Sequence, residues 1–233
     1  MLVDIFSSFD DMNQVFMSSY FYMWIFSFFT LFLFSLFLWL DNCSWMYIIS
    51  LFKNVISSQI FRSLGLKLGG FMNVISSIFL LIIFTNLISL VPYVFSSSSH
   101  LVMSFSLGFP LWLSLILSSV SLNWSSVVAS LLPMGAPAAL NPFLVVIETV
   151  SILVRSITLS VRLTANMSAG HIVLTLIGNY LCSSVFISLI SCIMLIFIQV
   201  FYTIFEFGIS VIQAYIFCLL VTLYSDEHSY YIK

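Results

Sequence analysis

Two long apolar runs decide the fold of this chain: residues 143–181 read FLVVIETVSILVRSITLSVRLTANMSAGHIVLTLIGNYL, and residues 185–224 read VFISLISCIMLIFIQVFYTIFEFGISVIQAYIFCLLVTLY. Neither run contains a proline, so both are expected to be helical. At about 1.5 Å per residue each helix would reach nearly 60 Å, about twice the hydrocarbon thickness of a bilayer. We therefore expect two membrane helices that tilt steeply or bend.

The composition of the whole chain agrees with a membrane location. Of the 233 residues, 62% are hydrophobic and 6% are charged, against about 25% charged in a typical soluble domain. The chain is therefore expected to be an all-α integral membrane protein. Its net charge of −2 and its lack of a basic run argue against a nucleic-acid partner.

Four further segments complete a single predicted membrane domain over residues 1–233. Residues 15–40, 71–90 and 101–120 are long and apolar enough to cross a bilayer. Residues 45–67 instead place polar side chains on one helical side and apolar side chains on the other, which is typical of an amphipathic surface helix. The prediction is thus about five membrane-crossing helices plus one surface helix.

Basic residues predict the orientation of the chain. Lys53, Arg62 and Lys67 lie between the first and second predicted spans, so the positive-inside rule puts them on the cytoplasmic or matrix side. Five crossings then place the N-terminus outside and the C-terminus inside.

Four charged residues interrupt the apolar chain between residues 68 and 225, and all lie in the two long helices: Glu148, Arg155, Arg162 and Glu206. Insertion scales put the cost of such residues at roughly 2.5 to 3.5 kcal/mol each, or on the order of 10 kcal/mol together in lipid. These side chains must therefore pair or line a water-filled cavity.

Spacing groups the polar residues of the first long helix. Glu148, Arg155 and Arg162 are seven residues apart, so each is rotated by only about 20° from the last, and Asn166 continues the stripe one turn later. His171 lies on nearly the opposite side, where it could face the second long helix.

Two interpretations of these residues stay open. Glu206 and Gln213 are seven apart and share a face of the second helix, so the set could be a structural ion-pair network between the helices. Alternatively the set could be a proton path, because carboxylates and imidazole titrate whereas arginine effectively does not. An intramembrane ionisable residue favours the functional interpretation.

No pattern in the sequence indicates a catalytic, metal or cofactor site. The chain has no GxxxxGK[ST] run, no HExxH, no CxxC pair and too few histidines for two pairs of haem ligands. A self-contained ion-coupled membrane transporter remains an alternative, although such proteins are expected to show internal repeats and broken helices.

Several motifs resemble the subunit a family of F-type ATP synthases, especially its mitochondrial form. The specific ones are SVRLTANMSAGH (residues 160–171) and IQAYIFCLLVTLY (residues 212–224). LVPYVF, PLW, LLPMGAP and IETVS (starting at residues 90, 110, 131 and 147) have counterparts in the same order.

This resemblance implies a non-catalytic, proton-translocating stator that couples proton flow to ATP synthesis. Its partners would be a rotating ring of c subunits, the peripheral stalk, other Fo membrane subunits and the lipid bilayer, with protons as the transported ion and no cofactor. The two long helices would form a tilted hairpin against the ring. The location would be the mitochondrial inner membrane, with the N-terminus in the intermembrane space and the C-terminus in the matrix.

The resemblance also implies roles for individual residues. Arg162 matches the family's essential arginine, which separates two aqueous half-channels and faces the ring carboxylates. The remaining matches are Glu206 and His171 in the outer half-channel, Glu148 near the matrix side, Asn166 and Gln213 as polar neighbours of the arginine, and Arg155 as possible support.

The chain departs from the family pattern in two places. Ser156 stands where many mitochondrial relatives have proline. Around residues 130–137, Ser130, Met134 and Ala136 replace a histidine, a glutamine and a threonine that relatives often show.

Overall fold

A computed structural model describes residues 9, 25, 44–63, 65, 68–91, 96–132, 140–186 and 188–226 of the chain. Every regular element in these residues is a helix, as the all-α prediction required. The predicted first span, residues 15–40, falls outside the described residues except for Ile25, and residues 133–137 also fall outside them.

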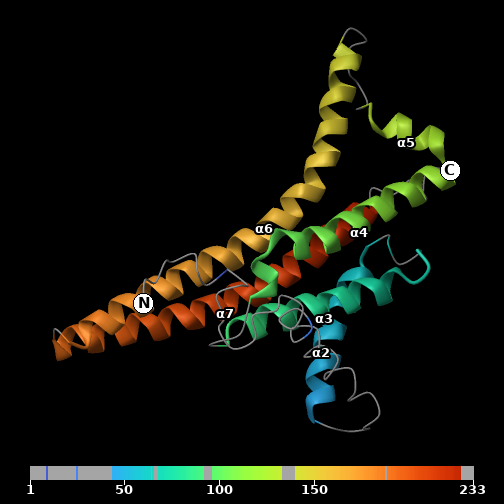
Figure 1. Cartoon of the computed structure of the whole chain (residues 1–233). Coiled ribbons are helices and arrows are strands. Elements are labelled where there is room, and N and C mark those ends of the chain that lie inside the picture. The colour runs from blue at the N-terminus through green and yellow to red at the C-terminus, as the bar shows by residue number, and fades with distance from the viewer. Residues whose placement is uncertain are drawn as a thin grey trace.

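The two long helices dominate the molecule. Helix α6, Asn141–Ser184, has 44 residues, and helix α7, Leu189–Asp226, has 38. Pro142 occupies the first turn of α6, where its missing N–H would have had no helical acceptor. The helices run antiparallel and side by side as a hairpin, and α6 changes direction along its length (Figure 1). The bounds of the two helices agree with the predicted runs to within four residues. Helices of this length were expected to tilt or bend, and α6 bends (Figure 1).

Two shorter apolar helices pack against this hairpin. Helix α3, Phe71–Ser89, follows Gly70, whose φ of 80° is a left-handed conformation that glycine adopts without strain. Helix α4, Leu101–Leu122, packs on both α6 and α7, and the short helices η5, Ser97–Ser99, and α5, Trp124–Ser130, flank it. Within the described ranges four helices are long and apolar enough to cross a membrane, namely α3, α4, α6 and α7.

The amphipathic segment forms a shorter helix than predicted. Helix α2, Ser44–Ile60, ends seven residues before the predicted end at residue 67. Beyond Ile60 the amides of Arg62 and Ser63 bond to carbonyls three residues back, which tightens the chain and ends the helix. The turn brings Gly65 so close to Phe71 that an added Cβ would collide with that ring.

Part of the apolar side of α2 is buried in the protein. Ile56 and Ile60 are fully buried in the main core, where α2 meets α3 and α7. Gln59 Nε2 also donates a 2.6 Å hydrogen bond to the Tyr215 hydroxyl of α7. Only the remaining apolar residues of α2, such as Leu51 and Val55, are free to face a membrane surface.

Candidate functional site

A buried glutamate lies where α6 and α7 pack together. Glu206 on α7 is 3% exposed, and it lies against Gly170 of α6 so closely that any Cβ at residue 170 would overlap its carboxyl group. Among the described residues neither oxygen of Glu206 has a hydrogen-bond partner. Buried polar groups of this kind are normally satisfied by water.

A cavity of about 370 Å³ adjoins this carboxyl group, and we call it the Glu206 cavity. Asn166 Nδ2 donates a 2.7 Å hydrogen bond across the hairpin to Gln213 Oε1, and both side chains line the cavity. Its other lining residues are Met167, Ala169, Gly170, Tyr202, Ile209, Ile212 and Ile216. Three of the predicted site residues, from two helices, therefore share one space with room for water.

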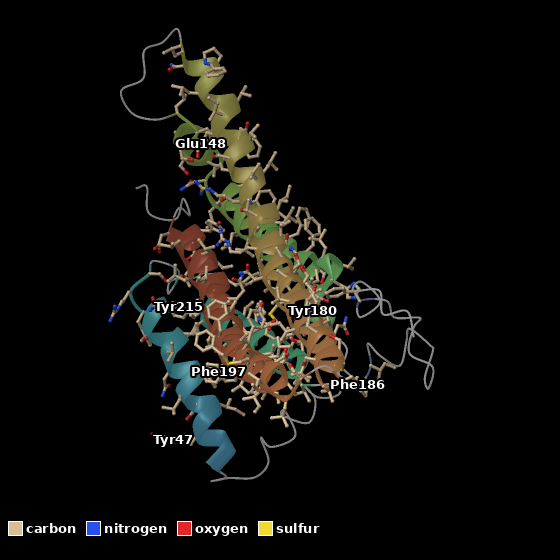
Figure 2. The ribbon with its side chains drawn as sticks, turned by 90° about the vertical axis from the view of Figure 1, so that its left-hand side faces the viewer. Tyr47, Glu148, Tyr180, Phe186, Phe197 and Tyr215 are labelled. Carbon is tan, nitrogen blue, oxygen red and sulfur yellow. The ribbon has the colours of Figure 1, made fainter. Side chains whose placement is uncertain are left out.

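A second cavity, of about 690 Å³, lies among α4, α5, α6 and α7, and we call it the Glu148 cavity. Glu148 and Arg155 line it, with Arg155 Nη2 at 3.9 Å from Glu148 Oε1. Tyr224 and Ser130 are also in its wall. In Figure 2, Glu148 lies toward the opposite end of α6 from Tyr180 and from Phe186 in the turn that follows the helix.

Close side-chain packing separates the two cavities. On α6 the lining of the Glu148 cavity ends at Arg155 and that of the Glu206 cavity begins at Asn166, 11 positions later, or about 16 Å along the helix. Buried side chains of both long helices fill this interval. We call the apolar ones the seal: Leu159, Leu163, Phe217, Cys218 and Val221. Four hydroxyl residues are buried in the same interval, and each donates to a carbonyl of its own helix: Ser156, Ser160, Thr164 and Thr222. Such close-packed apolar side chains leave little room for water.

Arg162 lies beside the seal but outside both cavities. It is exposed on α6, and no carboxylate of the described residues lies within ion-pair distance of its guanidinium. A guanidinium facing lipid alone is costly. The fold therefore leaves this charge to be compensated by something other than the described part of the chain.

His171 is placed differently from its predicted companions. It directly follows Gly170, yet it lines neither cavity; its ring meets that of Phe9 edge to face with centroids 6.5 Å apart. Its Nε2 atom is buried, with no hydrogen-bond partner in the described ranges. The structure thus brings together Asn166, Glu206 and Gln213 but does not place His171 in the same wall.

Sequence reasoning did not identify two polar residues of these helices. Asn86 of α3 is fully buried and its Nδ2 donates to the Ser210 carbonyl of α7 at 3.4 Å, one turn from Glu206. The sequence could have pointed to Asn86, because it is an amide residue inside the otherwise mostly apolar run 71–90. Tyr224 lies with its ring 5.7 Å from the Arg155 guanidinium carbon, a contact that spacing within one helix could not reveal.

Comparison with known proteins places these features in a family. The family model described as ATP synthase A chain matches residues 16–226. The chain belongs to the ATP synthase A chain family. This membership confirms the resemblance drawn from the SVRLTANMSAGH and IQAYIFCLLVTLY motifs.

Individual relatives agree with the family match. The chain is 44% identical over 151 residues to the ATP synthase F(0) complex subunit a of Rhopalosiphum padi, a stretch covering 65% of each protein. It is 41% identical over 170 residues to ATP synthase subunit a of Artemia franciscana, a stretch that covers 71% of this chain and 76% of that protein. It is 45% identical over 151 residues to ATP synthase subunit a of Drosophila melanogaster, a stretch that covers 65% of this chain and 66% of that protein. The chain spans about two thirds of the length of such relatives.

Proposed function

We propose that this protein is the proton-translocating stator subunit of a rotary ATP synthase. In this proposal the Glu206 cavity belongs to an outer aqueous half-channel and the Glu148 cavity to an inner one. Arg162 is the charge that separates them and faces the carboxylates of a rotating c-subunit ring. The chain itself is not catalytic, and coupled proton flow drives ATP synthesis elsewhere in the complex.

One observation carries the proposal: an exposed arginine lies on α6 between two cavities, each lined by a glutamate, that close packing keeps apart. A continuous pore would need a water-lined connection, whereas the described residues between the two cavities are buried and closely packed. An arrangement of two half-paths requires a proton to leave the chain, move on a carrier and re-enter. Arg162 is exposed on α6 between the two cavities, and this supports a carrier that meets the chain at Arg162.

The physical cycle follows from the cost of burying charge. A proton arriving through the Glu206 cavity neutralises a ring carboxylate, which can then face lipid without carrying a charge into it. After the proton is released toward the Glu148 cavity, the fixed positive charge of Arg162 attracts the ionised carboxylate and opposes direct proton passage. Each charge that crosses yields about 2.3 kcal/mol per 100 mV.

The same proposal includes the location of the chain. We place it in the mitochondrial inner membrane with its N-terminus in the intermembrane space and its C-terminus in the matrix. Lys53 and Arg62 support this orientation because basic residues between spans favour the inner side. The peripheral stalk and other Fo membrane subunits are its further partners.

Reconstitution tests this function against the transporter alternative. The purified chain in sealed vesicles should pass protons no faster than protein-free vesicles, because the path is interrupted at the seal. Adding the c ring, or using the whole complex, should restore flux. Proton or substrate transport by the chain alone at the rate of the complex would overturn the proposal in favour of a transporter.

A further inference from the structure

The Glu148 cavity contains a contact between helices that the proposed proton path does not itself require. The Tyr224 ring, in the last turns of α7, lies 5.7 Å from the guanidinium carbon of Arg155 on α6. Arg155 in turn lies 3.9 Å from Glu148. A ring, a cation and a carboxylate therefore follow one another along the cavity wall.

The Tyr224 contact fits the register of the hairpin. Arg155 and Asn166 are 11 residues apart on α6, and Gln213 and Tyr224 are 11 apart on α7. Because Asn166 bonds to Gln213, antiparallel packing in the same register brings Arg155 opposite Tyr224. The contact is thus fixed by the same packing that forms the Glu206 cavity.

The ion pair alone is a weak constraint on Arg155. The two side chains are 31% and 41% exposed and meet at 3.9 Å, near the limit of an ion pair. Exposed pairs of this kind contribute little, because water screens them and two long side chains lose freedom. An aromatic ring beside the guanidinium adds an attraction that restricts where Arg155 can go.

We propose that Tyr224 is a positioning residue: its ring holds Arg155 in place, and Arg155 keeps the Glu148 carboxylate at the wall of the Glu148 cavity. Only the consequence for inward proton release rests on the proposed function. The positioning itself is a property of this chain and can be measured separately.

Chemical labelling of Glu148 in the assembled complex tests the positioning. Glu148 is the only carboxyl side chain between residues 68 and 205, so its peptide reports it without interference. We would measure its rate of modification by a water-soluble carbodiimide and an amine, using mass spectrometry. Tyr224→Leu and Arg155→Gln should each raise the rate about two- to fivefold, the change expected for losing an exposed cation–π contact.

Matched variants separate the ring from general disturbance. Tyr224→Phe keeps the ring and should label at the parent rate, as should Leu223→Ala, which trims the neighbouring exposed side chain. In an Arg155→Gln background, Tyr224→Leu should add no further increase, because its effect passes through Arg155. Tyr224→Met gives the same comparison if Tyr224→Leu does not assemble. The proposal would be overturned if Glu148 were modified at the parent rate in Tyr224→Leu or Tyr224→Met. It would also be overturned if Tyr224→Leu raised the modification rate by its full factor in the Arg155→Gln background.

Proton flux in the same vesicles distinguishes the two proposals. If Glu148→Gln left ATP-driven proton pumping unchanged, the inward-path assignment of Glu148 would fail while the labelling result stood. If pumping fell in Glu148→Gln but labelling did not respond to Tyr224→Leu, only the positioning role would fail.

Discussion

At the residue scale, the environment of Glu206 is set by a glycine on the facing helix. Gly170 has no Cβ, and any Cβ there would occupy the position of the Glu206 carboxyl group. The carboxyl group is therefore held beside its cavity by α6 backbone rather than by a hydrogen-bonding side chain of the described residues. In the proposed function this is the group that exchanges protons with water in the cavity.

Replacing Gly170 with alanine should displace Glu206 without unfolding the hairpin. Overpacking costs about 1–3 kcal/mol, while alanine gains about 1 kcal/mol of helix propensity over glycine, so the net cost is small. We expect normal assembly but reduced ATP-driven proton pumping in vesicles. Gly178→Ala is the control, because nothing lies within 4 Å of a Cβ at that position of α6. Equal pumping by the two variants would show that Gly170 does not position Glu206.

Replacing Glu206 with glutamine should slow proton conduction with assembly intact. Glutamine keeps the shape of the side chain but cannot carry a proton. We expect flux to fall on the order of a hundredfold, the low end of what a positioned proton-transfer group contributes. Passive proton flux through the membrane part of the complex is the measurement, and parent-like flux would remove Glu206 from the path.

Seven-residue spacing was sufficient to group most of these residues but not all. It placed Glu206 and Gln213 on one face, and in the structure both side chains line one cavity with Asn166. It could not reveal Tyr224, because that contact depends on the register between two helices. The predicted approach of His171 to the second helix depended on side-chain direction, which periodicity alone does not define.

At the element scale, the seal depends on how closely α4 approaches the hairpin. Gly108 of α4 lies over it, and an added Cβ there would meet Leu159 at 3.2 Å and Phe217 at 3.9 Å. The helix backbone therefore covers the apolar interval between the cavities directly. Three helices, rather than Arg162 alone, would then oppose a leak of protons.

Leu163→Asn should make the membrane leaky to protons. Leu163 is 3% exposed in the seal, so an amide there would recruit water between the two cavities. The loss of packing is comparable to a buried Leu→Ala change, about 2–5 kcal/mol, so assembly has to be checked alongside. We expect faster decay of an imposed pH gradient than in the parent. Val146→Asn, at an exposed position of the same helix, should not raise the leak; an equal leak in both variants would argue against the seal.

The lengths of the elements were predictable where composition changes sharply. The apolar run between Gly70 and Pro92 predicted α3, and two long apolar runs without proline predicted α6 and α7, all to within four residues. The end of α2 was predicted wrongly, because polar–apolar alternation continues past Ile60 while the chain turns to bring Gly65 against Phe71. That turn is a tertiary constraint with no periodic signal.

At the scale of the whole molecule, three features follow one another along the hairpin of α6 and α7. The Glu206 cavity, the seal and the Glu148 cavity follow one another, and Arg162 faces outward beside the seal. Composition predicted the membrane fold, and the positions of the charged residues along the sequence predicted the concentration of charge in these helices. It could not predict that Glu206 and the Glu148–Arg155 pair line two separate cavities while Arg162 lines neither, because that division depends on the packing of α4 and α7.

Arg162→Lys is the most direct test of the account. A lysine keeps a nominal positive charge but lacks the planar fork of donors and, unlike guanidinium, can give up its proton in an apolar interface. In vesicles carrying the assembled complex, we predict that ATP-driven proton pumping is abolished while subunit composition stays normal. Near-normal pumping by Arg162→Lys would contradict the role of this side chain as the fixed charge between two half-channels.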